Sequence, residues 1–191
     1  LFGNWLGSRL PVEQVQRVSL PYPPPETDKC MPRVLLEAVV RVGERRLRVA
    51  TSHLEYYSRR QRLAQVQALV EHQREILAWP QGGGDEEEAT FRAWPRPAEA
   101  VWLGDGNFAP EDEEYRLLEE SGLWFDAWRL VHGEAPHEHT VGLHGAEWPD
   151  HPYCCDYAWV SAALRPAVRD FFVVRDTAAS DHQPIVLDLE F

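Results

Sequence analysis

Polar side chains with catalytic potential stand at the ends of several predicted strands. They are His53, Asp105, Asn107, Asp156, Asp181 and His182. A layered sheet brings its strand ends together, so we expect these side chains to meet at one rim. Carboxylate and amide oxygens suit a hard cation such as Mg²⁺ or Mn²⁺, and imidazoles suit acid–base chemistry near neutral pH. The combination indicates metal-assisted attack of water on a phosphate ester.

Short apolar, β-branched runs predict the strands that would position these residues. Residues 34–42 and 45–51 are predicted to form a hairpin, with its turn at Gly43 and Glu44. Further strands are predicted at residues 101–103, 156–161, 171–175 and 185–189. Strands separated by long loops and a small number of helices are typical of an α+β or layered α/β domain.

Helices are predicted between some of these strands. Ser58 has the residue type of an N-cap, Gln61 completes a capping box, and apolar residues recur at helical spacing through to Trp79. The acidic residues 111–114 crowd the start of a second helix, where the helix dipole favours negative charge, and Gly122 ends it.

The predicted loop at residues 132–152 holds a second candidate site, His137-Glu138-His139. Imidazoles two residues apart can bind a transition metal in a loop. The sequence has neither an HExxH helix nor a cysteine at zinc-ligand spacing, so solvated loop histidines are the preferred interpretation. Residues 81–98 are interpreted as a solvated loop without a site.

Charge and cysteine content limit the function classes further. The chain has 191 residues, with 19 Lys and Arg against 31 Asp and Glu, which gives a net charge of −12. This balance excludes a metal-free protein that binds nucleic acid through a basic surface. Cys30, Cys154 and Cys155 are interpreted as buried free thiols, which favours a reducing, cytoplasmic location. No apolar run is long enough to span a membrane.

At these residues the sequence resembles the endonuclease/exonuclease/phosphatase family, whose members have the DNase I-like fold. Matching segments follow the family's order across nearly the whole chain: Gly3-Asn4 with Ser8-Arg9-Leu10-Pro11, Thr51-Ser52-His53-Leu54, Gly104-Asp105-Gly106-Asn107, Asp156-Tyr157 and Ser180-Asp181-His182-Gln183-Pro184. Arg62 and Gln65, in the helix after His53, also fit the family's arrangement. Each segment alone is a weak signal, whereas their common order is a strong one.

The resemblance implies a role for each matching residue. Asp105 would orient or deprotonate the attacking water, and Asn107 would hold a phosphate oxygen. His182 would contact the scissile phosphate, while Asp156, hydrogen-bonded to it, would fix its charge and orientation. His53 would stabilise phosphate charge or assist the leaving group.

The resemblance also implies a divalent metal, Mg²⁺ or Mn²⁺, with Asp181 among its ligands. The family's principal metal-binding Glu, and an Asn before it, belong upstream of the first matching segment and are absent from this chain. Neither Glu13 nor Glu37 is a substitute. Residues 1–191 are therefore expected to form an endonuclease/exonuclease/phosphatase domain lacking its N-terminal strands. The expected fold class is α/β (α+β), a four-layer sandwich of two packed, mainly antiparallel sheets flanked by helices.

The expected function is metal-dependent hydrolysis of phosphate ester bonds, of the phosphodiesterase or nuclease type, by an activated water. We expect a monomer that acts on a phosphate-ester substrate, with nucleic acid among the candidates. Arg59, Arg60 and Arg62 lie close to His53 in the sequence and are expected to offset the negative charge at a cleft. The alternative is a catalytically inactive DNase I-like binding module, or a truncated fragment, that lacks the metal-binding Glu.

Overall fold

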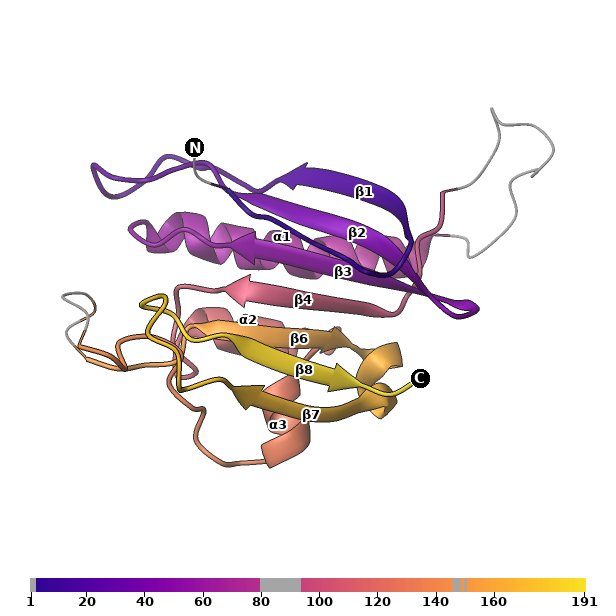
Figure 1. The fold of residues 1–191 in the computed structure, drawn as a ribbon. Helices are drawn as coiled ribbons and strands as arrows, with labels where there is room; N and C mark the ends of the chain where they lie inside the picture. Colours follow the sequence, from indigo (N-terminus) through magenta and orange to yellow (C-terminus); the bar gives the residue numbers. More distant parts are fainter. Residues whose placement is uncertain (1–2, 80–93, 146–148, 150) are drawn as a thin grey trace.

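The computed structural model describes residues 3–79, 94–145, 149 and 151–191 (Figure 1). Its larger sheet has six strands in the order β1-β2-β3-β4-β6-β5. These strands are β1 (Val12–Ser19), β2 (Val34–Val42), β3 (Arg45–His53), β4 (Ala100–Asp105), β5 (Trp124–Asp126) and β6 (Asp156–Ser161). Neighbouring strands are antiparallel except β3 and β4, which are parallel. The carboxyl ends of β3 and β4 therefore lie at the same edge of the sheet.

A second sheet and the helices complete the layers. They are β7 (Val168–Val173), β8 (Ile185–Leu189), α1 (Arg59–Ala78), α2 (Glu113–Glu120), α3 (Ala127–His132) and a 3₁₀ helix (Ala162–Ala167). The antiparallel pair β7–β8 packs on one face of the larger sheet, where Leu187 and Leu189 join the cluster of Val101 and Val160. Helices α1 and α2 cover the opposite face (Figure 1). The expected pair of packed, mainly antiparallel sheets with flanking helices is confirmed.

Helix α1 is the crossover that allows β3 and β4 to run parallel. Ser58 caps this helix, since its side-chain oxygen accepts a hydrogen bond from the backbone N–H of Gln61 at 3.3 Å. The predicted capping box forms only in part, because the side-chain amide of Gln61 donates to the carbonyl of Pro23 at 2.6 Å. This contact ties the loop before β2 to the start of α1.

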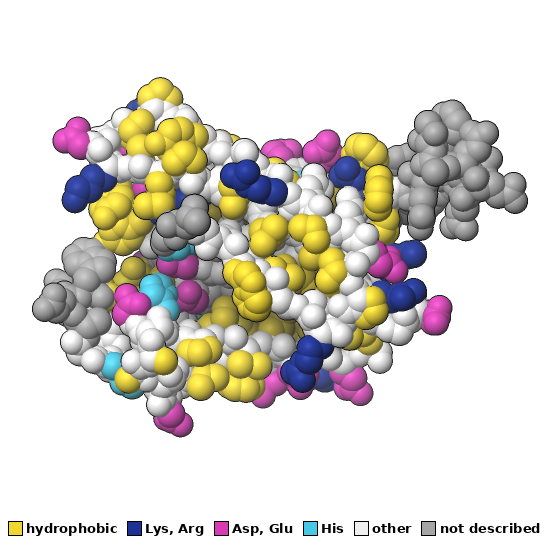
Figure 2. All heavy atoms as spheres, turned by 45° about the horizontal axis from the view of Figure 1, so that its top comes forward, with side chains coloured by type: hydrophobic (Ala, Val, Ile, Leu, Met, Phe, Trp, Pro, Cys, Tyr) yellow, Lys and Arg dark blue, Asp and Glu magenta, His cyan; other side chains and the backbone are white. Residues whose placement is uncertain are grey.

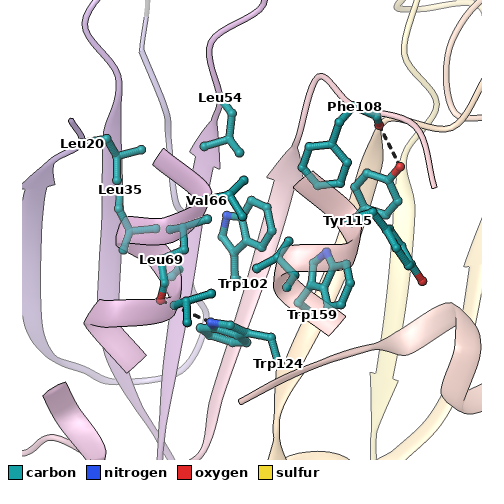
Figure 3. Packing of buried hydrophobic residues seen from close by; sticks show 14 of the residues in the cluster. Leu20, Leu35, Leu54, Val66, Leu69, Trp102, Phe108, Tyr115, Trp124 and Trp159 are labelled. Atoms are coloured by element: carbon teal, nitrogen blue, oxygen red, sulfur yellow. Dashed lines mark hydrogen bonds between the residues drawn. The ribbon is translucent and has the colours of Figure 1, made fainter. Parts of the chain in front are cut away.

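The core between the larger sheet and its helices is built on tryptophan. Trp102 and Trp159 are paired across β4 and β6 and are almost completely buried (Figure 3). Trp124 of β5 donates its indole N–H to the carbonyl of Leu69 in α1 at 3.3 Å. Replacing a buried ring of this size by alanine costs about 3–5 kcal/mol. This layer therefore fixes the positions of β4, which ends at the candidate site, and of β6, which begins there.

The predicted elements agree with the structure except where the sequence pattern is weak. β1 was not predicted, because Val12, Val15 and Val18 do not alternate strictly and an irregular register follows Val12. β5 and α3, with three and six residues, are too short for a periodic signal. The strand predicted at residues 171–175 lies earlier, at Val168–Val173.

Other sequence predictions have mixed outcomes. Cys30, Cys154 and Cys155 are free, as predicted. Cys154 and Cys155 are also buried, whereas the prediction that Cys30 is buried was wrong, because its side chain is only partly buried. The loop predicted at residues 81–98 falls largely on residues that the structure does not describe. Among the described helices, none combines the length and the apolar character that a membrane crossing requires.

Candidate active site

Three of the predicted site residues form one row across the larger sheet. His53 at the end of β3 is paired with Asp105 at the end of β4, and Asp105 is paired with Asp156 at the start of β6. Paired residues of neighbouring strands point to the same face of a sheet. This face is the one that carries Val49 and Leu103 and that packs against β7–β8. The predicted convergence of strand ends at one rim is confirmed for these residues.

The loop before β8 brings His182 over this row. Nδ1 of His182 lies 2.8 Å from Oδ2 of Asp156, and its Nε2 lies 3.9 Å from Oδ2 of Asp105. Nε2 of His53 lies 3.4 Å from the same Asp105 oxygen. Asp105 is therefore flanked by two imidazoles. His53 comes from the larger sheet, and His182 comes from the loop that leads into β8.

The turn after β4 is held by its own polar side chains. Asn107 has a φ of 53°, in the left-handed region that asparagine tolerates better than most residues. Its backbone N–H donates to Oδ1 of Asp105, and its side-chain amide donates to the carbonyl of Leu54, both at 2.8 Å. These bonds fix the Asp105 carboxylate beside the end of β3.

Thr140 supports the Asp156 carboxylate, and the sequence analysis missed it. The hydroxyl of Thr140 donates to Oδ2 of Asp156 at 2.7 Å. The same hydroxyl oxygen accepts from the backbone N–H groups of Cys155 and Asp156, both at 3.1 Å. Thr140 comes from the segment between α3 and β6, so no local pattern could have linked it to Asp156.

The environment shifts the pKa values of His182 and His53 in opposite directions. The hydrogen bond with Asp156 raises the pKa of His182 to about 9, which makes this imidazole cationic at neutral pH. Burial, reinforced by the charge of Arg33, lowers the pKa of His53 to about 4 and keeps it neutral. Burial and the neighbouring charge of Asp156 raise the pKa of Asp105 to about 6. A carboxylate with this pKa can act as a base near neutrality.

His53 and Asp105 of this row line an open pocket of about 240 Å³. Figure 2 shows a hollow on one face of the molecule where histidine and acidic side chains gather. Besides His53, Asp105, Asn107 and His182, the described lining includes Met31, Arg33, Tyr56, Tyr57, Val141, Pro149, Tyr153 and Asp181. The predicted site residues therefore line one cavity, except Asp156, which contacts the lining residue His182.

Arg33 lines the pocket, although it was not among the predicted site residues. Arg33 lies just before β2, is almost completely buried, and has Nε 3.2 Å from Oε2 of Glu55. The same Glu55 oxygen accepts from the backbone N–H of Met31 at 3.0 Å. The sequence carried no signal for Arg33 because it is one of many arginines and matches no motif.

The arginines expected at the cleft are engaged elsewhere. Arg59 pairs with Glu113 at 2.7 Å, and Arg62 pairs with Glu114 at 2.9 Å. Neither they nor Arg60 line the pocket. The prediction of a cluster beside His53 was wrong, because Arg59 and Arg62 bind the acidic start of α2 and Arg60 contacts the carbonyl of Pro24.

The described residues fit a hard divalent cation. The pocket presents the carboxylates of Asp105 and Asp181 and the amide of Asn107, which are oxygen donors of the type that Mg²⁺ prefers. His182 is cationic and hydrogen-bonded to Asp156, so it is unsuited to hold Mg²⁺.

The second candidate site has a structural explanation. Nε2 of His137 lies 2.5 Å from Oδ2 of Asp126, and its ring stacks on Trp128. His144 contacts the carbonyl of Arg175 at 2.9 Å. Within the described residues, these histidines form no group suited to a metal. His137 is buried rather than solvated, which corrects the sequence interpretation for that residue.

A titration of the metal-free protein by NMR tests the electrostatics of the site. We expect the His182 ring to titrate near pH 9 and the His53 ring near pH 4, on either side of the ordinary value of 6.5. Asp156→Asn should lower the His182 pKa towards 6.5, because the bond with Asp156 is the main cause of its rise. An unchanged His182 pKa in that variant would contradict this assignment.

The same shift has a consequence for stability. Because folding raises the His182 pKa from 6.5 to about 9, protonated His182 stabilises the fold fully below pH 6.5. This contribution is lost as the pH rises through 9, so Asp156→Asn should flatten that part of the stability profile.

Several solved structures align with this chain over nearly its whole length. An endonuclease/exonuclease/phosphatase family protein from Bacteroides thetaiotaomicron aligns with a TM-score of 0.67 at 14% identity, over 94% of this chain and 65% of its own. A mannosyl-6-phosphatase from the same species aligns with a TM-score of 0.68 at 16% identity, over 95% of this chain and 67% of its own. TDP2 of D. rerio, complexed with a single-strand DNA product, aligns with a TM-score of 0.64 at 18% identity, over 96% of this chain and 68% of its own.

These alignments define the fold class of the chain. Neither a protein-family model nor a curated protein sequence matches it. The chain has the DNase I-like fold of the endonuclease/exonuclease/phosphatase proteins, as the sequence resemblance implied. It spans about two thirds of the length of these structures.

Proposed function

We propose that this protein is a metal-dependent hydrolase of phosphate esters, of the phosphodiesterase or nuclease type. The observation that carries the proposal is that Asp105 and His182 line the same pocket while Asp156 holds the His182 ring. It combines a carboxylate that can accept a proton with an imidazolium held in place by a second carboxylate. The structural neighbours, which include a phosphatase and a DNA-bound protein, support phosphate-ester hydrolysis in general.

In the proposed reaction, Asp105 is the base. A carboxylate with a pKa of about 6 is mostly ionised at neutral pH and still basic enough to take a proton from an attacking water. The backbone N–H of Asn107 and the turn after β4 hold Oδ1 of Asp105, which leaves Oδ2 facing the two histidines. The water would therefore be activated beside Oδ2.

His182 and Arg33 supply positive charge for the phosphate. Asp156 holds the His182 ring and keeps it protonated, and Thr140 holds Asp156. Charge fixed before the reaction stabilises the additional negative charge of a pentacoordinate phosphorus. His53 is neutral in this environment, so we propose that it donates an N–H to a phosphate or leaving-group oxygen.

We propose Asp181 as a ligand of Mg²⁺ or Mn²⁺ in the same pocket. A bound cation would neutralise phosphate charge and polarise the ester. The amide of Asn107 would orient a phosphate oxygen with the hydrogen that it does not use on Leu54. We further propose that residues 1–191 form most of a single endonuclease/exonuclease/phosphatase domain and act as a monomer.

The charge of the chain bears on the substrate. At a net charge of −12, a long polyanion is repelled at low ionic strength, whereas a small ester is repelled less. TDP2 and the mannosyl-6-phosphatase, judged by their names and bound product, act on quite different molecules. We therefore propose the reaction class, with nucleic acid as one candidate substrate among several.

Metal removal is the direct test of this function. With bis(p-nitrophenyl) phosphate as substrate, we expect release of nitrophenol in Mg²⁺ and its loss in excess EDTA. Addition of Mg²⁺ beyond the EDTA should restore the rate, which serves as the control for irreversible damage. Full activity in EDTA would overturn the metal-dependent mechanism. No hydrolysis of any phosphate ester, by a folded protein with Mg²⁺, would instead favour the inactive binding module.

A further inference from the structure

Cys155 lies beneath the pocket and has no part in the proposed reaction. Its Sγ lies 4.0 Å from Nδ1 of His182 and 3.5 Å from Oδ2 of Asp156. Its backbone is fixed on both sides, because its N–H bonds to Thr140 at 3.1 Å and its carbonyl accepts from Gly106 at 2.7 Å. The thiol is therefore held against the catalytic row.

Asp105, Cys155 and His182 present one ligand atom each within 4.8 Å of one another. A tetrahedral zinc ion, with bonds of about 2.3 Å to sulfur and about 2.0–2.2 Å to nitrogen and oxygen, sets its ligands roughly 3.5 Å apart. Each pair of ligand atoms would need to approach by no more than about 1.3 Å to meet this geometry. Thiolate, imidazole and carboxylate are all ligands of zinc in proteins, whereas a thiol is a poor ligand for Mg²⁺.

An ion can approach this group from the solvent. Cys155 is almost completely buried, but Asp105 and His182 both line the open pocket. A cation that enters the pocket therefore meets the carboxylate and the imidazole first and the thiol beneath them.

We propose that Zn²⁺ binds between Asp105, Cys155 and His182 and thereby inhibits the protein. The binding site is inferred from the geometry alone, whereas the inhibition rests on the proposed function. Burial raises the pKa of the Cys155 thiol, so the thiol is protonated in the metal-free protein and Zn²⁺ must displace its proton. Zinc also displaces the imidazolium proton of His182 and occupies the Asp105 carboxylate. It thus removes both the cation and the base of the proposed reaction.

Cobalt binding tests the site without any need for activity. Co²⁺ takes the same tetrahedral ligands as Zn²⁺ and gives a thiolate charge-transfer band in the near ultraviolet. We expect this band in the original chain and in Cys154→Ser, which alters the neighbouring buried thiol outside the group. We expect its loss in Cys155→Ser, with Cys155→Ala as the second variant. Thermal unfolding verifies that each variant is folded.

Zinc affinity and inhibition complete the test. Competition with a chromophoric chelator should show Zn²⁺ binding at least about 10–100-fold weaker in Cys155→Ser than in Cys154→Ser, since a direct ligand is lost. Zn²⁺ should inhibit ester hydrolysis in Cys154→Ser at concentrations that leave Cys155→Ser active. An unchanged cobalt band or zinc affinity in folded Cys155→Ser would overturn the site. Zinc binding through Cys155 by a protein inactive towards all esters would uphold the site while the proposed function fails.

Discussion

His182→Ala is expected to lower kcat/KM for phosphodiester hydrolysis by about 10²–10⁴-fold. The substitution removes the imidazolium that the Asp156 bond keeps protonated at the floor of the pocket. It also removes a positive neighbour of Asp105, whose Oδ2 lies 3.9 Å from the His182 ring. Both changes act on groups that would face the reacting phosphate, so the loss should be large in kcat as well as in kcat/KM.

The control for this variant is His139→Ala, which removes an exposed histidine outside the pocket lining. It should retain the original rate within about twofold, in line with the small effects of surface substitutions. His182→Ala also loses the stabilisation that the protonated ring gives the fold, so its thermal unfolding midpoint should fall, and activity is compared at a temperature at which both variants are folded. A folded His182→Ala variant that keeps most of its activity would exclude this imidazole from the mechanism.

Gly104→Ala is expected to destabilise the fold by about 3 kcal/mol or more. A Cβ at position 104 would lie 2.0 Å from the backbone oxygen of Ser52 in the paired strand β3. Because the contact is with backbone and not with a mobile side chain, β3 and β4 would have to separate. His53 and Asp105 are the next residues of these two strands, so the same separation would move them apart.

Urea unfolding measures this effect, and Gly3→Ala is the matched control. A Cβ at Gly3 meets no atom within 4 Å, so that variant should unfold within about 0.5–1 kcal/mol of the original chain. If Gly104→Ala were equally stable, the close approach of β3 and β4 would be wrong. If it were destabilised yet fully active, the link between this strand pair and the catalytic row would be wrong.

Much of the site could be predicted because its residues carry local signals. His53, Asp105 and Asp156 each lie where an apolar strand run meets a polar residue, and the strands themselves are visible as short β-branched runs. Asp181 and His182 precede another such run. The layered fold then follows from the alternation of strands with a capped, periodic helix. These signals depend on near neighbours in the chain, which a sequence displays directly.

Other parts of the site could not be predicted because they depend on contacts between distant segments. Arg33 faces the pocket because Glu55, which follows β2 and β3 in the sequence, holds its guanidinium. Arg59 and Arg62 are nearer to His53 in the sequence, yet they turn away to bind the acids of α2. Proximity to His53 in the sequence therefore did not predict which arginine lines the pocket.

The sequence by itself determined which residue types stand at the strand ends, and hence the class of chemistry that they support. Only the tertiary structure decided their protonation states and their partners. His53 and His182 are identical side chains, but burial beside Arg33 keeps His53 neutral, while the hydrogen bond that His182 donates to Asp156 keeps His182 charged. Cys155 likewise changes from an ordinary buried thiol to a candidate zinc ligand. The physical reason is that solvation and charge act through space, across strands that only folding brings together.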